Sequence, residues 1–287
     1  MPSSTAGPYP ASLRPASQWA GLSLDRPRVM GILNVTPDSF SDGGGRVGPA
    51  DAIAAGLAMA ADGADVIDVG GESTRPGAGA VPPEVEQARV MPVVQALARA
   101  GICVSVDTRN AATMRAALDA GARIINDVSG LAHDPGAAAT VAAYGCSIVV
   151  MHMRGVPATM NSLATYANVV PEVRDELLAR VAAAEAVGIA RDNIAIDPGI
   201  GFAKQAAQSQ AILRDLAVFA GLGYPVLVGV SRKAFIGALS GEPEAARRLG
   251  GSIAAAIFAA LHGATIFRVH DVRETVQALR VWHALCR

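Results

Sequence analysis

Polar side chains follow each of eight short apolar runs in this sequence, where they could do chemistry together. A strand-ending turn explains any one of them, because Asp, Asn and Gly end strands for local reasons. Eight in succession instead indicate an active site built on strand ends. The segments are Asn34-Val-Thr-Pro-Asp-Ser-Phe, Asp68-Val-Gly-Gly-Glu-Ser-Thr-Arg-Pro-Gly, Val106-Asp-Thr, Ile125-Asn-Asp, Met151-His-Met-Arg, Asp197-Pro-Gly-Ile-Gly-Phe, Ser231-Arg-Lys and Arg268-Val-His-Asp.

Asp107, Asn126 and Asp197 end three of these runs with short side chains that form hydrogen bonds. A carboxylate accepts paired N–H donors, and an amide offers both a donor and an acceptor. Together they suit the edge of a heterocycle with an amino-pyrimidinone pattern. Acid–base catalysis or metal ligation is the alternative for the two aspartates, although no His-x-His pair or carboxylate cluster with metal spacing accompanies them.

Lys233, Arg268 and His270 follow the last two runs, a position where many β/α-barrel enzymes bind phosphate. Arg holds phosphate oxygens through paired N–H groups, and a His beside an anion tends to stay protonated. We therefore expect a cationic, phosphate-binding edge. The amide oxygen of Asn34 could reach a Mg²⁺ ion that is otherwise held by water and substrate phosphate. The sequence leaves the role of His152 open.

The loops after the first two runs are long and rich in Gly, Pro and Ser. They cover residues 36–45 and 71–80, and such loops often act as lids that close over substrate. The first carries Asp38 and Asp42 and the second carries Arg75, so closure could pair opposite charges. Inert surface loops are the alternative.

The elements that position these residues follow a regular order from residue 28 onward. Short β-branched runs alternate with Ala- and Leu-rich helical segments, and Gly follows most of the helical segments. The pattern predicts an α/β fold, a single-domain (β/α)₈ TIM barrel over residues 28–287. A doubly wound sheet is the competing fold, but no Gly-rich dinucleotide turn follows the first strand. The expected strands are 29–35, 65–70, 102–107, 123–128, 147–153, 193–197, 225–230 and 265–270.

Composition narrows the class of protein further. Hydrophobic residues make up 51% and charged residues 17% of 287, and the net charge is −1, so no global field attracts nucleic acid. The most apolar stretch, 253–261, is about half of the roughly 20 residues that span a bilayer, so we expect no membrane segment. Residues 1–27 lack signal-peptide features and predict a loose N-terminal segment. Three widely spaced cysteines fit a cytoplasmic protein.

The two longest segments closely resemble the signatures of the dihydropteroate synthase family. These are Met30-Gly-Ile-Leu-Asn-Val-Thr-Pro-Asp-Ser-Phe-Ser-Asp-Gly-Gly and the segment from Asp68 to Gly77, and the remaining motifs occur in the family's order up to about residue 285. The resemblance implies condensation of para-aminobenzoate with a dihydropterin methyl diphosphate, with Mg²⁺ as cofactor and a pocket open to sulfonamides. Homologues are usually dimers, so a homodimer is implied, although the Ala-rich helix at 252–261 could equally be buried within one chain.

The resemblance also assigns site residues. Asn34 would contact Mg²⁺, and catalysis would use the loop residues Asp38, Asp42 and Arg75 with Lys233, Arg268 and His270. Thr74, Arg268 and His270 would face the diphosphate. The pterin pocket would contain Asp107, Asn126, Met151, Asp197, Gly229 and Lys233. The para-aminobenzoate pocket would contain Phe40, Pro76, Phe202 and the backbone of Lys233 and Ala234; several family members have a hydroxyl residue in place of Ala234.

Two other functions share a pterin pocket. A non-catalytic pterin-binding paralogue would be expected to lose loop residues such as Asn34, Phe40, Asp42 or Arg75, and all are present. The pterin domain of a corrinoid methyltransferase has no diphosphate to bind, so it would lack the Ser231-Arg-Lys and Arg268-Val-His segments. Both segments are present, which favours the synthase.

Overall fold

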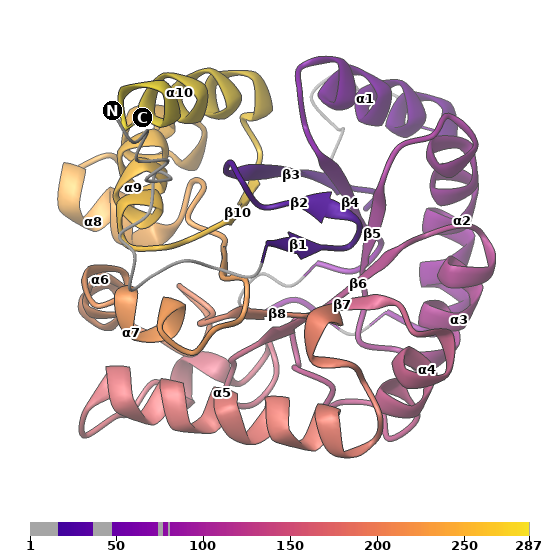
Figure 1. Ribbon diagram of the computed structural model, residues 1–287, viewed down its shortest axis with the longest axis horizontal. Helices are drawn as coiled ribbons and strands as arrows, with labels where there is room; N and C mark the ends of the chain where they lie inside the picture. The colour runs from indigo at the N-terminus through magenta and orange to yellow at the C-terminus, as the bar shows by residue number, and fades with distance from the viewer. Residues whose placement is uncertain (1–16, 37–47, 74–76, 80, 287) are drawn as a thin grey trace, which may run out of the picture.

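Eight parallel strands form one sheet that curls into a nearly closed barrel (Figure 1). The computed structural model describes residues 17–36, 48–73, 77–79 and 81–286. The sheet order is β8-β7-β6-β5-β4-β3-β10-β9, and the Ile196 N–H donates to the Pro225 carbonyl at 2.9 Å, joining the two outer strands. The strands are β3 (Arg28–Asn34), β4 (Val66–Gly70), β5 (Val104–Asp107), β6 (Ile124–Asp127), β7 (Ser147–Met151), β8 (Ile194–Asp197), β9 (Leu227–Val228) and β10 (Ile266–Val269).

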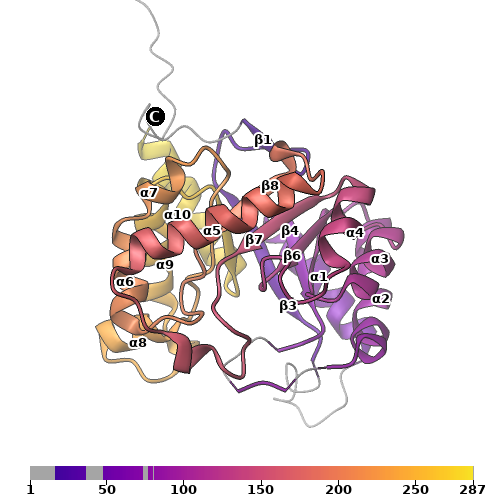
Figure 2. The same ribbon diagram turned by 90° about the horizontal axis from the view of Figure 1, so that it is seen from below.

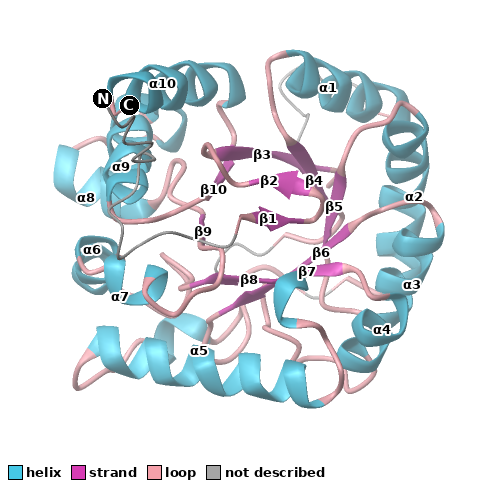
Figure 3. Cartoon of the chain, viewed as in Figure 1, coloured by secondary structure: helices cyan, strands magenta, loops and turns pink. Residues whose placement is uncertain are grey.

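Helices form a ring around these strands, as the α/β pattern predicts (Figure 3). One or two α-helices follow each strand of the barrel, and those that lie between two strands return the chain to the start of the next one. The bounds are α1 (Pro49–Ala61), α2 (Pro83–Arg99), α3 (Ala111–Asp119), α4 (Ala137–Tyr144), α5 (Val169–Ala186), α6 (Ala206–Arg214), α7 (Ala217–Ala220), α8 (Ala234–Ser240), α9 (Leu249–Leu261) and α10 (Val272–Leu285), with short 3₁₀ turns η3 (Met160–Leu163), η4 (Arg191–Asn193) and η5 (Ala245–Arg247). The barrel fold predicted from the sequence is confirmed.

Alternate strand residues point into the barrel, and their character changes along its axis. Near the strand starts the inward side chains are apolar and pack together: Met30, Val66, Ile124, Val149, Ala195, Leu227 and Ile266. Two residues further along six of these strands, the inward positions hold Asp68, Asn126, Met151, Asp197, Gly229 and Arg268. The apolar layer therefore supports a mostly polar layer at the C-terminal end of the barrel, where the site residues meet.

Residues 17–27 are ordered, contrary to the prediction of a loose segment that extends to residue 27. Two short strands, β1 (Gln18–Trp19) and β2 (Leu22–Ser23), form a hairpin at the N-terminal end of the barrel (Figure 2). The Trp19 ring is 2% exposed, packs on the apolar layer inside the barrel, and donates its indole N–H to the Asn193 carbonyl at 3.0 Å. The Trp19 ring therefore closes the N-terminal end of the barrel, and the burial of its apolar area stabilises this segment.

No helix in the described ranges is long and apolar enough to cross a membrane.

Candidate active site

Arg268 lies at the centre of the polar layer, between two buried carboxylates. Its Nε donates to Asp68 Oδ2 at 2.6 Å, and its Nη2 donates to Asp107 Oδ2 at 2.7 Å. The Asn126 amide donates to the same Asp68 oxygen at 3.0 Å. Side chains from β10, β4, β5 and β6 thus form one connected network across the barrel mouth. The structure brings the predicted residues Asp107, Asn126 and Arg268 together.

Burial and the neighbouring charges shift the pKa values of Asp107 and Arg268 in this network. Burial raises the pKa of Asp107 to about 7, although the Arg268 guanidinium opposes the shift. Burial also works against the charge of Arg268, but the carboxylates of Asp68 and Asp107 keep its pKa above the ordinary value. The charge of Arg268 is thus paired within the protein, because an unpaired guanidinium at this depth would be too costly. Its contact with phosphate stays a prediction.

Asp68 is a site residue to which the sequence reasoning assigned no role. It is fully buried, and its second oxygen, Oδ1, has no hydrogen-bond partner in the described structure. The available signal was a carboxylate inside the apolar strand Val66–Gly70, because a buried charge requires a partner. Without Asp68, both Arg268 and Asn126 would lose their shared acceptor.

A second group of side chains surrounds Asp197 at the end of β8. Asp197 Oδ1 accepts a hydrogen bond from the Gly199 N–H at 2.7 Å, and burial raises the pKa of the carboxyl despite this bond and the nearby Lys233. Burial also lowers the pKa of Lys233 to about 8, against the attraction of Asp197. The Lys233 ammonium lies 4.1 Å from the centre of the Phe202 ring, a cation–π contact.

Apolar residues line this group. Met151 is 2% exposed and packs in one buried cluster with Met153, Met160 and Ala203, and Phe202 packs against that cluster. A Cβ atom at Gly229 would meet no atom within 4 Å, so space is open above the end of β9. Met151, Asp197, Phe202 and Lys233 therefore lie together at the mouth as predicted, with Gly229 beside an open space.

His270 follows β10 and contacts Ser231 rather than a carboxylate. The His270 N–H donates to Ser231 Oγ at 3.2 Å, and that hydroxyl lies 3.0 Å from His270 Nδ1. Because Ser231 accepts the backbone N–H, its own proton can go to Nδ1, which leaves the ring proton on Nε2. Burial, together with Arg232 and Arg268, lowers the pKa of His270 to about 4. This lowered pKa favours a neutral ring without a bound anion, and the expected protonation beside an anion stays a prediction.

The predicted magnesium ligand, Asn34, ends β3 and is half-buried. A Cβ at Gly70 would lie 3.8 Å from Asn34 Oδ1 and 3.5 Å from the Asp107 Cβ, so both side chains border the same backbone. Among the described residues, no group of three or more His, Cys, Asp or Glu side chains could hold a metal ion. This donor set fits Mg²⁺ only if a single amide oxygen is completed by water and substrate phosphate.

Six predicted residues belong to the two long loops. Asp38, Phe40, Asp42, Thr74, Arg75 and Pro76 lie outside the described residues. In the described part of the second loop, Glu72 forms a buried ion pair with Arg109 at 2.7 Å. The same Glu72 oxygen accepts the Val81 N–H at 3.2 Å, so one carboxylate connects both ends of this loop.

Comparison with known proteins agrees with this geometry. Residues 30–270 match the family model of the pterin binding enzymes. The dihydropteroate synthase of Escherichia coli strain K12 is 46% identical over 269 residues, covering 93% of this chain and 95% of that enzyme.

Two solved structures are also similar over nearly the whole chain. The dihydropteroate synthase of Xanthomonas albilineans with 4-aminobenzoic acid has a TM-score of 0.88 and 49% identity, covering 93% of this chain and 96% of that one. The Yersinia pestis enzyme in complex with a sulfonamide drug has a TM-score of 0.87 and 43% identity, covering 92% and 96%. The chain therefore belongs to the dihydropteroate synthases, within the family of pterin binding enzymes.

Proposed function

We propose that this enzyme condenses para-aminobenzoate with (7,8-dihydropterin-6-yl)methyl diphosphate, giving 7,8-dihydropteroate and diphosphate. The observation that carries the proposal is the shared position of Asp107, Asn126 and Asp197 at the barrel mouth, beside Lys233 and Arg268. Carboxylates that accept paired N–H donors, and an amide that does both, complement the polar edge of a pterin. The cations beside them complement its diphosphate.

Asp197, Asp107 and Asn126 together recognise the polar edge of the pterin in this proposal. Asp197 Oδ1 is occupied by the Gly199 N–H, which leaves Oδ2 to accept N–H donors of the ring. Asn126 exchanges hydrogen bonds with the ring, and Met151 and Gly229 provide an apolar wall and an open space for its faces. Lys233 bonds to the ring from the Phe202 side.

The departing diphosphate is stabilised by donors on the other edge. Arg268 uses two of its five N–H groups on Asp68 and Asp107, so three can donate to phosphate oxygens. His270 donates its Nε2 proton, because Ser231 occupies Nδ1. Mg²⁺ held by Asn34 and the diphosphate would neutralise charge that develops on the leaving group.

The amine of para-aminobenzoate is already nucleophilic, so no strong general base is required. In this proposal Asp38 or Asp42 stabilises positive charge on the pterin methylene, and Arg75 pairs with them when the loops close. Phe40 and Pro76 enclose para-aminobenzoate with Phe202, and Thr74 binds the diphosphate.

A two-substrate assay tests this function. Purified protein with Mg²⁺ is expected to release diphosphate only when both organic substrates are present, and a sulfonamide should compete with para-aminobenzoate.

Chelation of Mg²⁺ should lower turnover, because the leaving group loses its counter-ion. The variant Asn34→Ala removes the proposed Mg²⁺ ligand, so its turnover should respond less to added Mg²⁺ while the fold is retained. Folded protein without turnover would contradict the proposal.

We also propose a cytoplasmic homodimer that pairs α9 and α10. The α9 helix buries Ala255, Ala256, Ala259 and Ala260 against its own chain. Its other side exposes Phe258 and Leu261, and α10 exposes Val281 and Leu285. The two helices lie next to each other (Figure 1). A patch of this kind on a folded protein is typical of an interface.

The cytoplasmic location is supported by the cysteines. All three are free, as is usual for proteins of a reducing compartment.

Replacement of one interface residue tests the homodimer. Leu261→Glu is expected to halve the mass measured by light scattering, because a charge would have to be buried in the proposed interface. Val187→Glu, on an exposed apolar residue elsewhere, is the control and should leave the mass unchanged. A wild-type monomer at micromolar concentration would contradict this proposal.

A further inference from the structure

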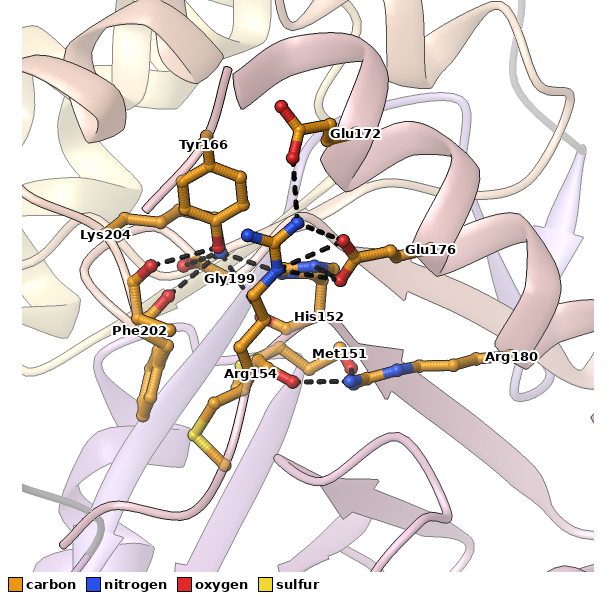
Figure 4. A network of polar contacts seen from close by, with 12 residues as sticks. Met151, His152, Arg154, Tyr166, Glu172, Glu176, Arg180, Gly199, Phe202 and Lys204 are labelled. Carbon is orange, nitrogen blue, oxygen red and sulfur yellow. Dashed lines mark hydrogen bonds and ion pairs between the residues drawn. The ribbon is translucent and has the colours of Figure 1, made fainter. Parts of the chain in front are cut away.

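Lys204 is a buried cation that the proposed reaction does not use. Lys204 lies in the turn that connects β8 to α6, and its side chain points toward Gly199, Phe202 and His152 (Figure 4). Only 8% of the residue is exposed, and burial lowers its pKa to about 7. The ammonium donates to the carbonyls of Gly199 and Phe202 at 3.0 and 2.9 Å, and it lies 2.9 Å from His152 Nδ1. Lys204 thus binds the same turn that carries Phe202.

This turn has an unusual backbone that needs such support. Gly199, Gly201 and Ala203 have φ angles of 68°, 80° and 48°, so three residues in five are in the left-handed region. The alanine lacks the freedom of glycine, because its Cβ disfavours the left-handed region. A Cβ at Gly199 would lie 2.0 Å from the His152 carbonyl oxygen, so the turn is pressed against the chain after β7. External hydrogen bonds must therefore select this conformation.

The opposite end of the network anchors Lys204 to α5. Because Lys204 donates to His152 Nδ1, the proton of the neutral ring is on Nε2, and it is donated to Glu176 at 2.9 Å. Burial lowers the pKa of His152 to about 3, in agreement with a neutral ring. Glu176 also pairs with Arg154, whose guanidinium lies 3.9 Å from the centre of the Tyr166 ring. The role of His152, which the sequence left open, is to connect Lys204 with Glu176.

Tyr166 holds the next residue of the turn. Its hydroxyl donates to the Ala203 carbonyl at 3.0 Å, beside the Phe202 carbonyl that Lys204 binds. Two adjacent carbonyls are therefore bound by donors from two segments, Lys204 in the turn itself and Tyr166 before α5. Phe202, whose carbonyl Lys204 binds, is also the residue whose ring centre lies 4.1 Å from the Lys233 ammonium.

We propose that Lys204 is a positioning residue, which holds the turn after β8 so that Phe202 forms the para-aminobenzoate pocket against Lys233. The inference rests on the proposed function, in which Phe202 borders para-aminobenzoate. Asp197 begins the same turn, but its backbone is held by β8, and its carbonyl accepts the His152 N–H at 2.9 Å. Loss of Lys204 should therefore impair para-aminobenzoate binding more than pterin binding.

Steady-state kinetics of Lys204→Met test this inference. Methionine keeps much of the apolar volume but removes the donors, so the KM for para-aminobenzoate should rise roughly tenfold, as expected for a displaced binding group. The KM for the pterin diphosphate should change by less than about twofold. Tyr166→Phe removes only the donor to Ala203 and should shift the same KM by a smaller factor; this variant keeps the test decisive if Lys204→Met does not fold.

Two controls separate positioning from loss of stability. Glu172→Gln breaks the network at its solvent side, where Glu172 binds Arg154 at 2.9 Å, and should leave both KM values unchanged. Leu97→Ala destabilises a distant part of the core and should also leave them unchanged. Equal changes in both KM values, or an unchanged KM for para-aminobenzoate in both test variants, would overturn the inference. Absence of turnover in the wild-type enzyme would instead refute the proposed function.

Discussion

Replacement of Arg268 by methionine is expected to lower kcat/KM by at least about 100-fold, because the developing diphosphate loses a charged hydrogen-bond donor. The same change leaves the buried carboxylates of Asp68 and Asp107 without their shared cation. Breaking a buried ion pair from one side typically costs roughly 3–5 kcal/mol. Diphosphate release and chemical denaturation, measured on the same preparation, therefore report two consequences of one side chain.

The loss of stability should depend on pH in a definite direction. Burial already raises the pKa of Asp107 from 3.8 to about 7. A raised pKa means that the folded state holds the proton more tightly, so this carboxyl stabilises the fold at acidic pH and the contribution is lost as pH rises through 7. Removal of Arg268 raises the pKa further. The variant should consequently lose more free energy of unfolding at pH 8 than at pH 5.

The double variant Arg268→Met with Asp107→Asn separates the two effects. It removes one of the unpaired charges, so part of the stability should return at pH 8 while catalysis stays impaired. The same loss of stability at pH 5 and pH 8 would contradict the charge-pairing explanation. A kcat/KM close to that of the wild type would remove Arg268 from the catalytic machinery.

The barrel was predictable from the sequence because parallel strands buried on both faces are continuous apolar runs. All eight expected strands occur, and the largest difference is β9, for which 225–230 was expected and Leu227–Val228 is observed. Pro225 has no N–H to donate to a strand partner, which shortens this strand. The hairpin of β1 and β2 was missed because strands of two residues have no detectable period. Only the burial of Trp19 inside the barrel reveals it.

The position of the site could be predicted from the sequence, but the ion pairs between its side chains could not. Alternation places Asp107, Asn126 and Asp197 inside the barrel mouth, and the sequence is sufficient for that step. Arg268 is 200 residues from Asp68 and 161 from Asp107 along the chain, so only the closed barrel shows that they share charge. For the same reason, the neutral state of His270 depends on burial and on Arg232 and Arg268, which local sequence does not reveal.

The burial of Lys204 could not be predicted from the sequence. It stands two residues after Phe202, just beyond the Asp197-Pro-Gly-Ile-Gly-Phe motif. A lysine in a polar turn is normally solvated, so nothing in its type or spacing indicates a buried cation. Its role depends on the left-handed backbone of the turn and on His152 and Tyr166, which come from an earlier part of the chain.

Asp197→Asn should weaken pterin binding by about 1.5–3 kcal/mol, the range for a hydrogen bond to a charged group. The substitution is close to isosteric, and an asparagine oxygen can still accept the Gly199 N–H, so the turn should keep its shape. The change instead replaces the carboxylate oxygen that faces the pterin with an amide N–H₂ group. Donors of the pterin would then meet a donor, and one charge-assisted bond would be lost.

Calorimetric titration with 6-hydroxymethyl-7,8-dihydropterin, which lacks the diphosphate, measures this effect alone. Burial raises the pKa of Asp197, so wild-type affinity should fall as the pH is lowered through that raised value, and the difference between wild type and variant should shrink in acid. Asp192→Asn is the matched control, because Asp192 is an exposed carboxylate just before the same strand. If Asp197→Asn binds the pterin as tightly as Asp192→Asn does, Asp197 does not recognise the ring, and Asp107 with Asn126 must provide the recognition.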